Sequence, residues 1–160
     1  MKLLIELVLY CGVFTLMVRI FAGSSPLDCL YFYPKEYQEK AYERHLADRE
    51  TVQRNRERFL WIFTSVMCIV LILIIGAVNR VRDYRTAYLQ SLLFLEVMNW
   101  YDGIVIDRLW VGHDRFWYIE DLKDIPYVQT WSQVLKKRLL LTAVWILGSF
   151  LTAGMIVVLF

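Results

Sequence analysis

The sequence predicts an all-α integral membrane protein, a bundle of four transmembrane helices with a short amphipathic helix in the first loop. Two observations indicate this fold. Hydrophobic residues make up 58% of the 160-residue chain, more than in an ordinary soluble domain. They also gather in four blocks, each close to the ~20 residues with which a helix crosses the hydrocarbon core of a bilayer. We expect one membrane domain, 1–160, with transmembrane helices at 3–20, 59–78, 88–111 and 139–160 and connecting loops at 21–58 and 112–138.

The first block has some features of a secretory leader, because Lys2 precedes an apolar run and residues 21–24 resemble a cleavage site. Glu6 and Arg19 interrupt that run and favour a retained helix, with Glu6 near the membrane interface. The second block has no polar face over residues 68–76. A helix of a water-soluble bundle would show one, so this block indicates a helix surrounded by lipid.

The first loop is expected to contain the short amphipathic helix. Pro34 suits the first turn of a helix, and Tyr37, Ala41 and Tyr42 then fall near one face. Such a helix can lie on the lipid head groups with its tyrosines at the interface. It can also hold a partner or cover the mouth of a cavity.

Two capping patterns place the starts of later helices outside the membrane. Asp48 can cap a helix that continues into the block beginning at Phe59. Thr130 and Gln133 have the spacing of a capping box, so the fourth helix is expected to begin several residues before its apolar part. Both helices should therefore project beyond the hydrocarbon core.

The basic residues that flank the blocks predict the orientation. Most lie in the two longer loops, which the positive-inside rule places in the cytoplasm, with both termini outside. A net charge of +2 is too small to indicate nucleic acid as a partner, and we expect a bacterial inner membrane or a plasma membrane as the location. Two basic clusters can anchor the second and fourth helices to anionic lipid head groups, namely Arg54, Arg56, Arg58, Lys136, Lys137 and Arg138.

The third block carries the most informative polar residues, Glu96, Asn99, Asp102 and Asp107. An ionised side chain at the bilayer centre costs roughly 2.5–3.5 kcal/mol on insertion scales, so an acid at this depth is expected to have a function or a partner. At ~100° per residue, three of these residues fall on one stripe of the helix, with Asp102 beside it. Such a stripe must face the bundle interior or a water-filled cavity.

Four residues at the end of this helix are candidates for the mouth of that cavity: Arg108, Trp110, His113 and Asp114. Gly103, on the same stripe, permits the close approach of another helix or a ligand. The cations that we expect as partners for the acids are Arg19, Arg80, Arg108 and His113, with the amide of Asn79 as a further polar partner, and none lies clearly at the depth of Glu96.

Three functions agree with this pattern. The polar stripe can fix the helix register in a subunit or scaffold of a membrane assembly, with the lipid bilayer and a homo-oligomer or a larger complex as its partners. It can bind protons or cations in an oligomeric transporter or channel. It can also serve a metal-dependent membrane enzyme acting on a lipid, although the spacing departs from the Asn/Asp-rich magnesium motifs of intramembrane prenyltransferases. Small-residue faces for close contact in an oligomer occur at Gly148, Ser149, Thr152 and Ala153.

Enzymatic activity has the weakest support of these. Neither a nucleophile elbow nor a phosphate-binding glycine loop occurs, and His45 and His113 lie in separate loops. The sequence assigns no catalytic residue, and it leaves metal and cofactor open. The scaffold role is therefore the first prediction, with the ion-binding role and the lipid enzyme as alternatives.

Two segments resemble a known kind of protein. They are residues 30–36, LYFYPKE, and the pattern Asn99-x-x-Asp102-x-x-x-x-Asp107-x-x-Trp110. Together they are similar to small four-helix integral membrane proteins of bacteria that have no characterised function. This resemblance covers the first loop and the third helix. It implies a four-helix fold, and no activity, cofactor or substrate.

Overall fold

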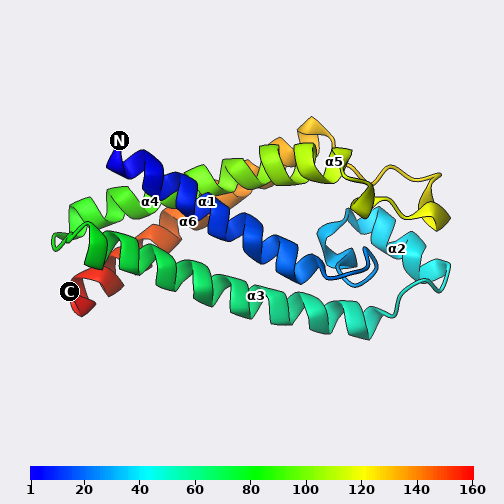
Figure 1. The fold of residues 1–160 in the computed structure, drawn as a ribbon, viewed down its shortest axis with the longest axis horizontal. Coiled ribbons are helices and arrows are strands. Elements are labelled where there is room, and N and C mark those ends of the chain that lie inside the picture. The colour runs from blue at the N-terminus through cyan, green and yellow to red at the C-terminus, as the bar shows by residue number, and fades with distance from the viewer.

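The computed structural model describes residues 1–160 as an all-helical chain without strands. Four long helical runs extend side by side along the molecule (Figure 1). The first is α1 (Lys2–Ala22), and the second is α3 (Arg49–Ile72), which ends in a π-helical turn, Leu73–Val78. The third consists of α4 (Tyr84–Tyr101), a π-helical segment that we call η3 (Asp102–Trp110) and α5 (Val111–His113), and the fourth is α6 (Trp131–Leu159).

Three of these runs are long and apolar enough to cross a membrane: Lys2–Ala22, Arg49–Val78 and Trp131–Leu159. The helical class predicted from the sequence is thus confirmed, and so are three of the apolar helices. The run from α4 to α5 is helical as expected, but it is not among the three. This run differs from the other three in the polar residues that it carries, which include Glu96, Asn99, Asp102 and Asp107.

The two ends of the bundle differ in character. Both chain termini and the turn between α3 and α4 lie at one end, and α2 (Lys35–Glu43) lies with the loop that follows α5 at the other (Figure 1). The two longer connections are therefore on the same side of the molecule. This is the arrangement that the charge distribution of the loops predicts.

The core of the bundle lies between α1, α3 and α4 and is rich in aromatic residues. Tyr10 and Phe14 of α1 meet Phe94 and Tyr101 of α4 edge to face. A hydrogen bond of 2.7 Å joins the hydroxyls of Thr15 and Tyr101 and links the same two helices. Apolar side chains also cover the outside of the bundle, where α6 exposes Leu139, Leu140, Leu147 and Leu151.

The predicted helix caps are confirmed. The Asp48 carboxylate accepts a hydrogen bond from the backbone N–H of Thr51, and Thr130 and Gln133 form a reciprocal capping box at the start of α6. The hydrogen bonds to Thr51 hold the pKa of Asp48 below its usual value, because they stabilise the charged form. Local sequence chemistry therefore sets where α3 and α6 begin.

The loops at one end form a second core, which we call the loop cap. Tyr37 and Ala41 of α2 are buried against the segment after α5. The Tyr33 hydroxyl donates a 2.9 Å hydrogen bond to the carbonyl of Trp117, and burial raises the pKa of this phenol well above its usual value. Arg44 forms a two-pronged ion pair with Asp124 at 2.7 and 2.9 Å. The apolar face of α2 is thus covered by protein.

Candidate functional site

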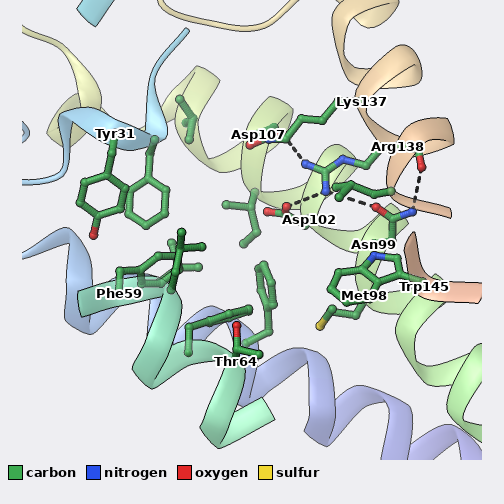
Figure 2. A pocket seen from close by; sticks show the side chains of 18 of the residues that line it. Tyr31, Phe59, Thr64, Met98, Asn99, Asp102, Asp107, Lys137, Arg138 and Trp145 are labelled. Carbon is green, nitrogen blue, oxygen red and sulfur yellow. Dashed lines mark hydrogen bonds and ion pairs between the residues drawn. The ribbon is translucent and has the colours of Figure 1, made fainter. Parts of the chain in front are cut away.

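A buried arginine of α6 meets the two aspartates of η3. The Arg138 side chain is only 1% exposed. Its Nη1 atom donates to Asp102 Oδ2 at 2.6 Å, and its Nη2 atom donates to Asp107 Oδ2 at 2.5 Å (Figure 2). One guanidinium therefore bridges both carboxylates, an arrangement that suits its planar fork of donors.

Two further side chains complete this cluster. Asn99 of α4 donates a 3.1 Å hydrogen bond from its amide to the backbone carbonyl of Arg138, and its side-chain oxygen accepts from the guanidinium at 3.4 Å. Lys137 donates to Asp107 Oδ2 at 3.1 Å. The two carboxylates and the two cations have a formal charge of zero, so the cluster holds no uncompensated charge in the bundle.

The π-helical geometry of η3 brings the two aspartates together. Asp107 lies five positions after Asp102, which in an α-helix would place the two residues ~140° apart around the axis. In a π-helix the hydrogen bonds run from residue i to residue i+5, so residues with this spacing come near the same side. Regular α-helical geometry predicts that Asp107 lies on the same stripe as Glu96. In the structure Asp107 pairs with Arg138 beside Asp102 instead.

Gly103 allows α6 to come close to η3. A Cβ atom placed on this glycine would lie 2.7 Å from Arg138 Nε, which is closer than real Cβ contacts, and 3.0 Å from Val134 Cγ1, which is tighter than most of them. Any larger residue would push the guanidinium away from its carboxylates. The role expected for Gly103, close approach of another helix, agrees with this geometry.

The prediction that Arg138 acts as a lipid anchor is corrected by its burial, whereas the same role for Lys137 stays a prediction. Arg138 is buried, and Lys137, although partly exposed, pairs with Asp107. The three basic residues follow one another in α6 and are ~100° apart around its axis, so their side chains point in different directions. Lys136 remains exposed, and so do Arg54, Arg56 and Arg58 on the projecting part of α3.

Glu96 lies apart from this cluster. Its Oε2 atom accepts a 2.9 Å hydrogen bond from Thr142 of α6, and its Oε1 atom is buried without a partner. No lysine, arginine or histidine forms an ion pair with it. Of the four predicted stripe residues, Asn99, Asp102 and Asp107 therefore converge on Arg138, whereas Glu96 depends on a neutral hydroxyl.

We expect Glu96→Gln to be tolerated far better than Glu96→Lys. A glutamine keeps the shape and can accept the hydrogen bond from Thr142, whereas a lysine would place a cation where the protein offers no acid. The measurement is the amount of protein in the membrane and its thermal unfolding in detergent. Equal loss of both variants would mean that the carboxylate has a charged partner outside this chain.

The four residues predicted at a cavity mouth instead make hydrogen bonds at the end of the third run, and one of them, Arg108, reaches the loop. Arg108 donates to the carbonyl of Gln129 at 2.6 Å, the indole of Trp110 donates to Asp114 at 2.9 Å, and His113 Nδ1 lies 2.8 Å from the carbonyl of Leu109. Hydrogen bonds from Phe116 and Trp110 hold the pKa of Asp114 below its usual value. None of the four lines the cavity found in the bundle.

That cavity lies beside the ion-pair cluster, between α1, α3, the third run and α6. It has a volume of about 320 Å³, and 13 of its 19 lining residues are hydrophobic. One wall is polar and consists of Asn99, Asp102, Asp107, Lys137 and Arg138. Figure 2 shows this wall facing Tyr31 and Phe59 across the pocket. A pocket of this size with one polar wall has the character of a small-ligand site.

Arg138 was not among the partners predicted for the acids, although the spacing of residues on the fourth helix indicates that Arg138 is buried. In a regular helix Ser149 lies eleven residues beyond Arg138 and hence ~20° from it around the axis. Both are fully buried in the structure. The face of small residues on the fourth helix thus marks the side that meets the third run. Ser149, Thr152 and Ala153 are buried within the chain, so they do not offer the oligomer contact that was predicted for them.

The donor set gives little support to a metal centre. Asp102 and Asp107 are engaged by Arg138, and no group of three or more His, Cys, Asp and Glu side chains is arranged to hold a metal ion. Comparison with known protein families, curated proteins and solved structures found no match.

Proposed function

We propose that this chain is a four-span membrane protein that acts as a non-catalytic subunit or scaffold of a membrane assembly. The observation that supports this role most directly is the pair of salt bridges from Arg138 to Asp102 and Asp107. Because these acids are neutralised inside the chain, their clearest role is to fix the third helical run against α6. This role agrees with the use of buried polar groups to specify helix register.

The cluster also supports a fourth membrane crossing by the α4–η3 run. Two of the charges that make this segment costly in lipid, Asp102 and Asp107, face cations of α6. Paired charges that face the interior of a bundle are tolerated in membrane proteins. Four crossings also agree with the position of both termini at one end of the molecule (Figure 1).

A labelling experiment tests this topology. In a cysteine-free background, single cysteines at Gln53 and Arg85, both exposed, should report opposite sides of the membrane. We expect an impermeant maleimide to label the Arg85→Cys variant in intact cells and to reach the Gln53→Cys variant only after permeabilisation. The reverse pattern would invert the orientation. Labelling of both sites from the same side would contradict an α3–α4 turn opposite the loop cap.

Partners of such a scaffold would contact the outer helix surfaces or the loop cap. The outer face of α6 is apolar along its length, with Leu139, Leu140, Leu147 and Leu151 exposed. Lipid or a partner helix can cover it, in a homo-oligomer or a larger membrane complex. A bacterial inner membrane or a plasma membrane is the proposed location.

A second candidate is a proton- or cation-binding role, and the observation that favours it concerns Glu96. Its Oε1 atom is buried and unpartnered, and the chain offers it no cation. A carboxyl group in this situation can take up a proton or a small cation. The third alternative, a metal-dependent lipid enzyme, gains no comparable contact.

One set of variants separates the two candidates. Asp102→Asn and Asp107→Asn combined with Arg138→Met removes the three charges together, and Glu96→Gln alone removes the other acid. For a scaffold we expect cross-linking in native membranes to give an assembly larger than the 19.1 kDa chain, retained in both variants. We also expect liposomes containing the protein to equilibrate protons no faster than empty ones. A proton flux that Glu96→Gln abolishes would establish the second candidate, and a monomer in native membranes would contradict the first.

A further inference from the structure

The cavity beside the ion-pair cluster opens sideways, between α3 and α6. Of all its lining residues, only Leu60, Thr64 and Lys137 are exposed. Leu60 and Thr64 follow the last basic residue of α3, Arg58, and Lys137 precedes the apolar part of α6. In the four-span arrangement this places the opening where the head groups meet the acyl chains. A molecule can therefore enter from the bilayer without passing the loop cap.

The polar wall of the cavity has one acceptor that the protein leaves free. Arg138 bonds only to Oδ2 of Asp102, and Oδ1 takes no hydrogen bond from the protein. The Asp102 side chain is 23% exposed, unlike the buried Arg138 beside it. Figure 2 shows the Asp102 carboxylate between the guanidinium and the open part of the pocket. A ligand with an N–H or O–H donor would satisfy this oxygen.

Lys137 gives the cavity free hydrogen-bond donors. Its ammonium group has three N–H donors, of which one pairs with Asp107, and its side chain is 44% exposed. A phosphodiester oxygen of a ligand can accept from the donors that remain. The indole N–H groups of Trp117 and Trp145, two other lining residues, have no partner in the protein but are closed off from the open space of the cavity.

The charge of the wall restricts the ligand further. Asp102, Asp107, Lys137 and Arg138 sum to zero, so a ligand with a net charge would bring an uncompensated charge into a site of low dielectric. A zwitterion keeps the balance if its cation meets Asp102 and its anion meets Lys137. The rest of the cavity is apolar and aromatic, with Phe14, Phe59 and Phe63 among its lining residues, and suits hydrocarbon.

We propose that this cavity binds a zwitterionic glycerophospholipid whose head group carries a protonated primary amine, as in phosphatidylethanolamine. The ammonium group donates to Asp102, the phosphodiester accepts from Lys137, and an acyl chain fills the aromatic part and leaves between α3 and α6. A quaternary ammonium has no N–H to donate to Asp102, so phosphatidylcholine lacks the main contact. Phosphatidylglycerol adds a net negative charge.

Native mass spectrometry of the purified chain tests this site directly. The protein is exchanged in detergent against phosphatidylethanolamine, phosphatidylcholine and phosphatidylglycerol with identical acyl chains, and against water-soluble glycerophosphoethanolamine. We expect phosphatidylethanolamine to be retained on the order of tenfold more tightly than phosphatidylcholine, which corresponds to about 1.4 kcal/mol. The soluble head group should not bind detectably, because it has no chain for the apolar part. Equal retention of the three lipids would overturn the proposal.

A matched pair of variants tests the position of the site without disturbing the ion-pair cluster. Thr64→Trp places a bulky ring at the opening, whereas Ser65→Trp adds the same ring at an exposed neighbour that does not line the cavity. We expect only Thr64→Trp to lower the retention of phosphatidylethanolamine. The same retention in the two variants would place the lipid elsewhere on the protein. This site goes beyond the scaffold role, since a chain that fails to bind the lipid can still form its assembly.

Discussion

Replacement of Arg138 by methionine is expected to destabilise the folded bundle by about 3–5 kcal/mol, the cost of breaking a buried ion pair by removing one partner. Methionine fills much of the same volume but leaves Asp102 without a cation and Asp107 with Lys137 alone. Thermal unfolding of the detergent-solubilised protein, followed by circular dichroism, measures the effect. The amount of protein in the membrane should fall as well.

Two controls distinguish loss of the ion pairs from loss of volume. Adding Asp102→Asn and Asp107→Asn to Arg138→Met should restore most of the stability, because the only charge of the cluster that then remains is Lys137, whose side chain is 44% exposed. Lys136→Met changes the exposed neighbour and should alter the free energy of unfolding by less than about 1 kcal/mol. An Arg138→Met protein as stable as the wild type would mean that this cluster does not hold η3 to α6.

Gly103→Ala is expected to cost about 1–3 kcal/mol, which is typical of an added methyl group in a tightly packed interior. The new Cβ would lie 2.7 Å from Arg138 Nε. Although an arginine side chain is usually free to move, this one is held by two carboxylates and by Asn99. The guanidinium must therefore shift away from its partners, or η3 must separate from α6.

Gly154→Ala is the matched control for this prediction. Gly154 lies on α6, and a Cβ atom there would have no neighbour within 4 Å. Alanine has the higher helix propensity by roughly 1 kcal/mol, so Gly154→Ala should leave the unfolding temperature unchanged or raise it. A similar loss of stability in the two variants would contradict close packing at Gly103.

The sequence predicted most of the fold because the relevant signals are local. The apolar blocks gave three helices with the composition of membrane spans, and the side chains of Asp48 and Thr130 gave the first residues of α3 and α6. The acids of the third block were also singled out as the polar centre. Each of these features depends on residues within a few turns of one helix.

The rest of the site depends on contacts that a linear pattern does not contain. The π-helical geometry of η3 changes the angle between Asp102 and Asp107 around the helix axis. No residue of that segment indicates this geometry in the sequence. Arg138 was read with Lys136 and Lys137 as one basic run, because its neighbours in the sequence are cations while its neighbours in space are acids. The loop cap likewise joins the first loop to residues more than 70 positions later, as in the contact between Arg44, just after α2, and Asp124.

The zero net charge of the cluster around Arg138 determines how a membrane potential would act on it. Moving one elementary charge through 100 mV is worth about 2.3 kcal/mol, so voltage can drive the movement of isolated charges. The two carboxylates and two cations of the cluster carry no net charge when they move together. In the proposed membrane setting, the potential would therefore do almost no work on this junction between the third run and α6.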